Sequence, residues 1–375
     1  MTEAGVAGST APFSRATRLP NSMRALRSLF LFAVLSAAAG CATTRQPPLA
    51  PPGISREETI TLGGLQQTIF IRGRNRANPV LLFLHGGPGL PEMPFSHLNA
   101  ELERDFTVVH WDQRGAGKSY RPEIPPESMN VRQFVRDTEE LTRHLRRRFG
   151  QKKIYLAGFS WGSLVGAFTA ARHPEYYRAY IGISQLVDIP ESELLLHRAG
   201  IAQAMERGYP HVARQLRAIG EPPYKTRREE RLVNKITKDL QPYFPGEMTR
   251  ARYLFLGLQS PYYSLADDWR VVRGITFSGK HLERAIDARN LAKEAPEIDV
   301  PVWFFLGRFD TVLSAPLAER YFHALRAPRG KHLVWFEHSD HILHLEENAR
   351  FRAELRSVLA ATRGDGPRRP NWAGR

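Results

Sequence analysis

The stretch that decides the fold is Gly158-Phe159-Ser160-Trp161-Gly162. It lies between an apolar run at residues 153–159, which predicts a strand, and a helical pattern at residues 162–173, which ends before a proline. A Gly-x-Ser-x-Gly sequence in this context is typical of a nucleophile elbow. The turn is so tight that side chains would not fit at its glycines. We therefore expect Ser160 to be a nucleophile and not an ordinary helix-cap serine.

Alternating strand and helix patterns surround this stretch. Short apolar runs predict strands at residues 68–72, 80–85, 107–111, 179–184, 302–306 and 332–336. A helical pattern at residues 131–149 ends at Gly150, a residue type common at helix C-termini. This alternation predicts an α/β fold with a mostly parallel sheet covered by helices on both faces.

Residues 185–281 break the rhythm. The segment is helix-like and rich in charge, shows no strand pattern of the sheet type, and is interrupted by Pro190, Pro210, Pro222, Pro242, Pro245 and Pro261. A structureless loop of this length would be unusual in a compact protein. We expect a helical cap here, inserted into a core made of residues 57–184 and 282–362.

A second glycine-rich motif, His85-Gly86-Gly87-Pro88-Gly89, follows the apolar run at residues 80–84. Its glycines leave backbone N–H groups unshielded. We expect the N–H groups of Gly87 and Trp161 to form an oxyanion hole, supported by the positive end of the helix that starts after Ser160. His85 precedes the serine in the chain, and we expect it to hold this loop and not to act as a base.

A serine nucleophile needs a base and an acid that orients the base. After a nucleophile elbow these follow in the order acid, then histidine. Asp310 comes just after the strand predicted at residues 302–306 and is the candidate acid. Three histidines follow the last predicted strand. His341 is the preferred base, His338 is the alternative, and His344, one helical turn further on, is expected to face elsewhere.

A third motif, Trp111-Asp112-Gln113-Arg114-Gly115-Ala116-Gly117-Lys118-Ser119, ends like a phosphate-binding loop. Its spacing is wrong for one, because the first glycine must stand further from the lysine. We expect Asp112 and Arg114 to form a buried ion pair that shapes the floor of the pocket.

The charge balance raises the question of a nucleic-acid partner. The chain has 375 residues, with 53 Lys and Arg against 38 Asp and Glu, which gives a net charge of +15. The arginines are spread along the chain, and no zinc-finger, RNP-type or helix-turn-helix pattern is present. A solvated basic surface explains the charge better than nucleic-acid binding.

The N-terminal residues predict export. Two arginines at residues 23–27 precede an apolar run at residues 28–39, which is too short to span a bilayer. Small residues then lead directly to Cys41, the single cysteine, and this stretch resembles a bacterial lipobox. Residues 1–41 are therefore expected to be a lipoprotein-type signal, with a lipid on Cys41 holding the protein on a membrane that faces the periplasm or cell exterior. A simple cleavable signal or a membrane anchor is the alternative.

Two further segments are expected to lie outside the folded core. Residues 42–56 contain a Pro-rich stretch that predicts a stiff linker. Residues 363–375 are rich in Gly, Pro and Arg and predict a disordered tail.

The motifs HGGPG, WDQRGAGKS, GFSWGS, GRFD and SDH together resemble the proline iminopeptidase family of α/β-hydrolases, over roughly residues 57–359 apart from the cap. The resemblance implies a serine exopeptidase that needs no cofactor and removes an N-terminal residue, often proline, from short peptides. By motif, it implies the triad Ser160, Asp310 and His341, with Gly87 and Trp161 as oxyanion donors. No metal site is expected. The family's cap acids bind the free amine of the substrate, and the unranked candidates here are Glu191, Glu193, Glu206, Asp267 and Asp268.

Other functions compete with this one. A carboxylesterase or another amide hydrolase would use the same triad. Dehalogenases and epoxide hydrolases of this fold carry an aspartate at the elbow, so Ser160 argues against them. A binding module without activity could share the fold, but the triad looks complete.

Overall fold

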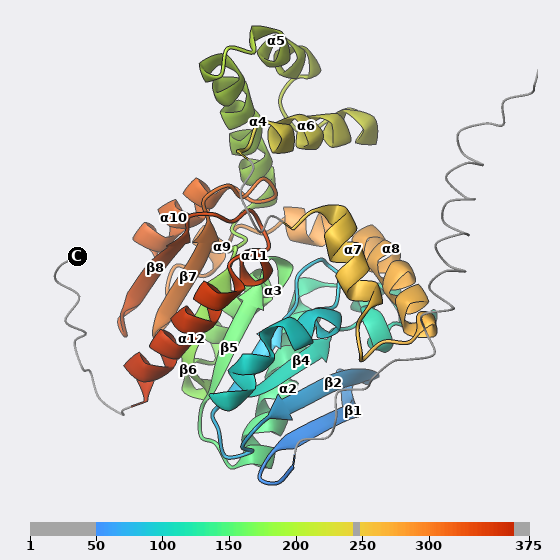
Figure 1. The fold of residues 1–375 in the computed structure, drawn as a ribbon, viewed down its shortest axis with the longest axis vertical. Coiled ribbons are helices and arrows are strands. Elements are labelled where there is room, and N and C mark those ends of the chain that lie inside the picture. Colours follow the sequence, from blue (N-terminus) through green and yellow to red (C-terminus); the bar gives the residue numbers. More distant parts are fainter. Residues whose placement is uncertain (1–49, 243–247, 364–375) are drawn as a thin grey trace, which may run out of the picture. The chain divides into compact units, whose positions relative to one another are not determined.

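The computed structural model describes residues 50–242 and 248–363 (Figure 1). Within these residues, eight strands form one sheet in the order β1-β2-β4-β3-β5-β6-β7-β8. The strands are β1 (Ile54–Leu62), β2 (Leu65–Gly73), β3 (Val80–Leu84), β4 (Thr107–Asp112), β5 (Ile154–Phe159), β6 (Tyr177–Ile183), β7 (Val302–Gly307) and β8 (Lys331–Phe336). β1 pairs with β2, and β2 with β4, antiparallel, while all other neighbours pair parallel. This confirms the predicted α/β fold class.

The N-terminal edge of the sheet begins earlier than the sequence patterns indicate. β1 starts at Ile54, inside the segment expected to be a linker, and it pairs with β2 from Ile54↔Gly73 to Leu62↔Leu65. Its sequence, ISREETITL, is mostly polar and alternates between intermediate and exposed positions along most of its length. An edge strand needs few apolar residues, so it lacks the apolar run that marks the buried strands.

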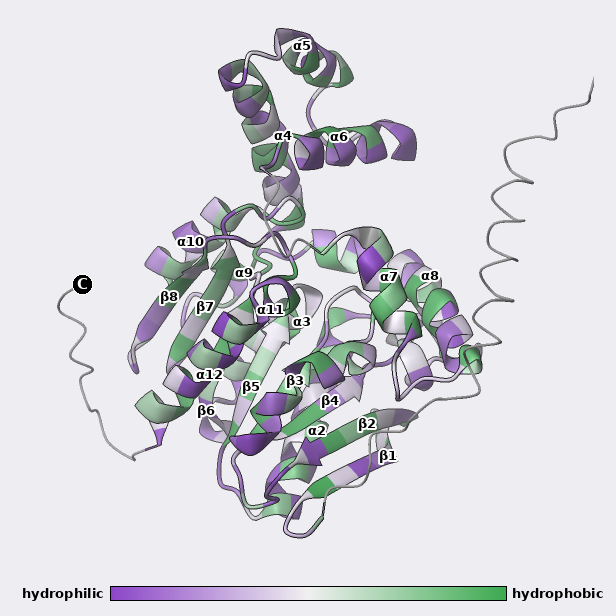
Figure 2. Cartoon of the chain, viewed as in Figure 1, coloured by the Kyte–Doolittle hydropathy of each residue, from purple (hydrophilic) through white to green (hydrophobic). Residues whose placement is uncertain are grey.

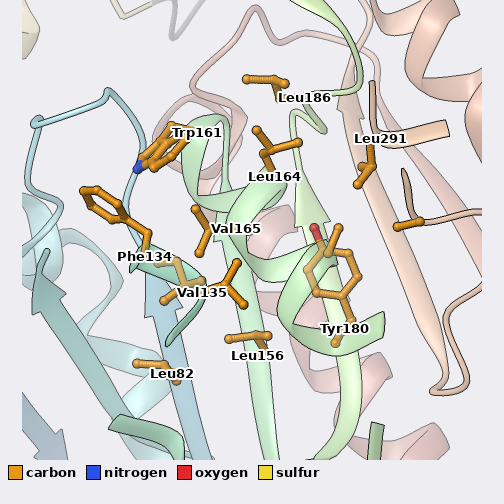
Figure 3. Packing of buried hydrophobic residues seen from close by; sticks show 14 of the residues in the cluster. Leu82, Phe134, Val135, Leu156, Trp161, Leu164, Val165, Tyr180, Leu186 and Leu291 are labelled. Carbon is orange, nitrogen blue, oxygen red and sulfur yellow. The ribbon is translucent and has the colours of Figure 1, made fainter. Parts of the chain in front are cut away.

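Successive residues of the central strands point to opposite faces of the sheet, and each face carries its own core. Leu82 of β3 packs in one core with the helices α2 (Val131–Phe149), α3 (Trp161–Arg172) and α10 (Ala315–Ala324). Leu81 packs in the other with the 3-10 helix η2 (Met93–Arg104), α11 (Leu343–Glu346) and α12 (Asn348–Thr362). Figure 3 shows the first core between the sheet and α3. A strand buried on both faces explains the continuous apolar runs in the sequence.

α2 shows how the local sequence sets the bounds of a helix. The side chain of Asn130 accepts a hydrogen bond from the N–H of Gln133 and caps the N-terminus, and Gly150 follows the last helical residue. Buried residues recur every three or four positions between these caps: Val131, Phe134, Val135, Asp137, Thr138, Leu141, Thr142 and Leu145. That spacing gives α2 one face to pack on the sheet.

Between β6 and β7 the described residues form helices and no strands. They are α4 (Ile189–Glu206), α5 (Pro210–Ile219), α6 (Arg227–Asp239), α7 (Arg250–Leu258), α8 (Leu265–Asp287) and α9 (Leu291–Glu294). α8 runs through residue 281, the expected end of the cap, to Asp287. Figure 2 shows hydrophilic and hydrophobic colours side by side along α6, as expected for a helix with one buried face.

The predicted export signal with Cys41 lies outside the described residues, as do residues 42–49 of the linker and residues 364–375 of the tail. Among residues 50–242 and 248–363, no helix is both long enough and apolar enough to cross a membrane.

Candidate active site

Ser160 lies in the turn between β5 and α3, with φ 52° and ψ −117°. A Cβ atom on Gly158 would lie 2.3 Å from the carbonyl oxygen of Gly162, and one on Gly162 would lie 2.2 Å from that of Leu84. Only glycine fits at either position. A positive φ at a residue other than glycine costs on the order of 1–3 kcal/mol, which the surrounding structure must offset. The sharp turn leaves the side chain of Ser160 at the carboxyl end of the parallel strands, where such sheets bind their ligands.

The structure brings Ser160, His341 and Asp310 together. Nε2 of His341 lies 3.0 Å from Oγ of Ser160, and its Nδ1 lies 2.9 Å from Oδ2 of Asp310. The other carboxylate oxygen, Oδ1, accepts hydrogen bonds from the N–H groups of Val312 and Leu313 at 2.9 and 2.8 Å. The three residues follow β5, β8 and β7, so three separate loops meet at one edge of the sheet.

The charges around His341 suit a base. Burial lowers the pKa of this imidazole, but the Asp310 carboxylate and its hydrogen bond outweigh burial, and the pKa lies above its ordinary value of 6.5. A neutral ring whose Nδ1–H donates to Asp310 leaves Nε2 free to accept the hydroxyl proton of Ser160. Ser160 is only 7% exposed and Asp310 9%, so little water competes for these hydrogen bonds.

The other histidines considered from the sequence lie elsewhere. His338 is exposed. His344 is buried, with its Nε2 2.9 Å from Oε1 of Glu92. Nε2 of His85 accepts a hydrogen bond from the N–H of Gln113 at 3.1 Å, and its Nδ1 lies 2.7 Å from the carbonyl oxygen of Gly86. His85 thus holds the loop after β3, as expected.

The two predicted oxyanion donors flank Ser160. Trp161 is the first residue of α3, where an N–H has no partner within the helix. A Cβ atom on Gly86 would lie 3.3 Å from Cβ of Ser160, so the loop that carries Gly87 runs beside the serine. In the described part of the chain, no protein group accepts a hydrogen bond from the N–H of Trp161 or of Gly87. Both remain available to an oxyanion.

Gln113 is a site residue that sequence reasoning missed. Its Nε2 donates to the carbonyl oxygen of His85 at 3.0 Å, and its Oε1 accepts from Nε1 of Trp161, also at 3.0 Å. One buried amide therefore links the loops of the two predicted oxyanion donors. Gln113 stands inside the DQRG motif, but spacing alone could not show which loops its side chain joins.

The expected ion pair between Asp112 and Arg114 is wrong. Arg114 pairs with Asp137 of α2 through two hydrogen bonds, at 2.9 and 3.1 Å. Asp112 instead accepts hydrogen bonds from the hydroxyl of Tyr263 and from the N–H of Lys118. Asp112 is the last residue of β4 and Arg114 lies in the turn that follows, and the two side chains contact different partners. Burial raises the pKa of Asp112 to about 7.

The five candidate acids of the cap have different surroundings. Glu191 pairs with Arg320, and Asp267 pairs with Arg270 and forms a capping box with Ser264 at the start of α8. Glu206 is exposed. Glu193 and Asp268 are half-buried, and in the described part of the chain neither side chain has a hydrogen bond or an ion pair. Burial and neighbouring acids raise the pKa of Glu193, and burial and Asp267 raise that of Asp268 to about 6.

No group of three or more His, Cys, Asp or Glu side chains in residues 50–242 and 248–363 could hold a metal ion.

Comparison with known proteins supports the fold described above. The family model described as alpha/beta hydrolase fold matches residues 79–348. The probable aminopeptidase YbaC of Bacillus subtilis (strain 168) is 34% identical over 308 residues, which cover 79% of this chain and 93% of that protein. The proline iminopeptidase of Lactobacillus helveticus (strain DPC 4571) is 32% identical over 130 residues, which cover 34% of this chain and 43% of that protein.

A similar solved structure is that of a proline iminopeptidase-related protein from Thermus thermophilus. It superimposes with a TM-score of 0.54 at 20% identity, over 82% of this chain and 98% of that chain. At this identity the likeness shows the shared fold.

Proposed function

The chain belongs to the alpha/beta hydrolase fold family, and we propose that it is a serine hydrolase that removes N-terminal residues from short peptides. The observation that carries the proposal is the continuous path of hydrogen bonds from Ser160 through His341 to Asp310. The similarity to a probable aminopeptidase over 93% of that protein's length supports the choice of substrate. Proline iminopeptidases, which match a shorter part of the chain, support it as well.

The reaction would proceed by acyl transfer. Oγ of Ser160 attacks the carbonyl carbon while Nε2 of His341 takes its proton, and Asp310 stabilises the imidazolium that forms. The N–H groups of Gly87 and Trp161 bind the negative charge on the carbonyl oxygen. His341 then gives its proton to the leaving amine, the C–N bond breaks, and an acyl-enzyme remains. Water, deprotonated by the same histidine, attacks the acyl carbon, releases the amino acid and restores the serine.

The same triad could cleave an ester, so a carboxylesterase or another amide hydrolase is the alternative. What separates an aminopeptidase from these is a group that binds the free amine of the substrate. Of the five cap acids, Glu193 and Asp268 suit this role best, because each is half-buried and, within the described residues, lacks a partner. A substrate ammonium group would stabilise the ionised form of either carboxylate.

Free-amine selectivity tests the proposal. Pro- and Ala-arylamides with free amines should be cleaved with a kcat/KM roughly a hundredfold or more above that of their N-acetylated forms, because a desolvated ammonium–carboxylate contact is worth on the order of a few kcal/mol. Glu193→Gln or Asp268→Asn should reduce this ratio while sparing the acetylated substrate. Glu206→Gln, which changes an exposed acid of the same cap, is the matched control.

Equal rates on free and acetylated arylamides would contradict the aminopeptidase. Activity on short acyl esters alone would favour the esterase and would leave the triad assignment intact.

A further inference from the structure

The loop that carries the base is fastened to the loop that carries the acid. Asp340 immediately precedes His341, and Thr311 immediately follows Asp310. Oδ1 of Asp340 accepts hydrogen bonds from the N–H of Thr311 at 2.9 Å and from its hydroxyl at 3.2 Å. One carboxylate thus joins the residue before the proposed base to the residue after the proposed acid.

The cap reaches the same carboxylate. Lys238, in the last turn of α6, donates from Nζ to Oδ2 of Asp340. The Asp340 side chain is 9% exposed and that of Lys238 39%, so the lysine reaches from the surface of the cap to a buried acid. A buried carboxylate that lost its cation would keep its desolvation cost without compensation.

A second contact joins the base loop to the cap. Glu346 of α11 accepts the N–H of Asp340 at 2.9 Å through Oε2, and the N–H of Met248, just before α7, at 3.0 Å through Oε1. The loop of His341 is therefore tied to the cap at the end of α6 and at the start of α7. Neither contact involves the three triad side chains.

We propose that Asp340 is a positioning residue for His341 and Asp310, and that its contact with Lys238 makes the alignment of the triad depend on the position of α6. This inference rests on the proposed function, since it concerns the same triad. Proton transfer between Ser160 and His341 requires a separation near 3 Å, and a displacement of about 1 Å can cost roughly a hundredfold in rate. A substrate that moves the cap on binding would thus change the position of His341, because Lys238 and Asp340 connect the cap to its loop.

Two substitutions that remove charges of opposite sign distinguish a positioning role of Asp340 from a contribution to stability alone. Within the described residues, the titratable groups facing His341 are Asp310, Asp340 and Glu346, and Lys238 faces it through Asp340. Burial raises the pKa of Glu346 to about 7. Lys238→Met removes a positive charge and should move the acid limb of the pH–rate profile to higher pH. Asp340→Asn removes a negative charge, keeps an oxygen for Thr311, and should move that limb to lower pH.

The experiment measures the rate at which a fluorophosphonate labels Ser160 in the full chain, as a function of pH. Lys238→Met should label about tenfold more slowly than the wild type even on the alkaline plateau, because the base is displaced. Lys235→Met is the matched control. Lys235 lies on the same helix and pairs with Asp239 at the surface, where the two side chains are 71% and 59% exposed, so this variant should behave as the wild type.

The outcomes separate the inference from the proposed function. No labelling of the wild type at Ser160 would overturn the proposed function. Normal labelling of the wild type, with Lys238→Met identical to Lys235→Met in rate and pH profile, would overturn the inference alone. Lys238 is partly exposed, so its variant gives a result even if Asp340→Asn fails to fold.

Discussion

Nε1 of Trp161 donates a hydrogen bond to Oε1 of Gln113 across 3.0 Å. The same amide holds the carbonyl oxygen of His85, so the two predicted oxyanion donors share one buried support. In a site that works by electrostatic preorganisation, the support of a donor matters almost as much as the donor itself, because the site must not reorganise as charge develops.

Gln113→Leu should therefore lower kcat by about 10- to 100-fold with little change in KM, because the loss falls on the transition state. Steady-state kinetics on an arylamide would measure both constants. Gln66→Leu, which changes an exposed glutamine of β2, should leave them unchanged. A rise in KM at constant kcat would show that Gln113 serves substrate binding instead.

Ser160 gives a prediction about stability as well as activity. Ser160→Ala should stay folded and lose nearly all activity, since no hydroxyl remains to attack. Ser160→Gly should be equally inactive but melt at a higher temperature than Ser160→Ala, because glycine adopts a φ of 52° without the cost that a Cβ atom brings. Circular dichroism melting of the two variants makes the comparison. An alanine variant at least as stable as the glycine variant would show that the turn stores no such strain.

His341→Ala should lower kcat/KM by several orders of magnitude, because no other described side chain contacts Oγ of Ser160 as a base. His338→Ala should change it by less than about twofold, since surface substitutions away from a site are usually mild. The reverse ranking of the two variants would show that the base is His338, one turn earlier in the chain.

Asp112 gives the protein a pH-dependent stability. Its pKa is about 7 in the folded state against an ordinary 3.8, so the folded state holds the proton more tightly. Its contribution to stability is complete below its ordinary pKa of 3.8 and is lost as pH rises through about 7. The side chain of Asp112→Asn does not ionise. The free energy of unfolding of this variant, relative to that of the wild type, should therefore rise from about pH 5 to about pH 8, on the order of a few kcal/mol. Chemical unfolding of both proteins at the two pH values tests this prediction. A stability advantage of the variant that is present at the lower pH and absent at the higher pH would refute it.

Cys41 carries the prediction about location. If the residues before it are a lipoprotein signal, as we propose, the mature chain starts at Cys41 and fractionates with membranes. Cys41→Ser should release or mislocalise the protein without changing the activity of the folded domain. Intact-mass analysis decides the matter: an unmodified Cys41 in the mature protein would exclude the lipid.

The buried centre of the fold could be read from the sequence because burial leaves a strong pattern. The helix predicted at residues 131–149 is α2 to the residue, since its helical periodicity and the glycine after its last residue mark it. The central strands stand out because both their faces are buried. β1 escapes recognition, because an edge strand such as ISREETITL needs few apolar residues.

The residues of the site could be predicted only where the order of strands along the sequence determines their position. Ser160, Asp310 and His341 each follow a recognisable strand, so the topology alone places them at one edge of the sheet. The partners of Arg114 and Gln113 depend on the direction of long side chains in a crowded interior. Neither spacing nor residue type gives that direction, which is why the predicted pair of Asp112 with Arg114 is wrong and the role of Gln113 was missed.

The proposed base stands 181 residues after the proposed nucleophile, beyond β8, which is the last strand of the described residues and an edge of the sheet. A ribosome therefore completes the elbow long before it supplies the histidine. Until β8 has paired with β7, the loop of His341 is not held beside Ser160, so the proposed base cannot take the proton of the serine. The position of β8 thus makes the proposed triad one of the last parts of the described chain to form.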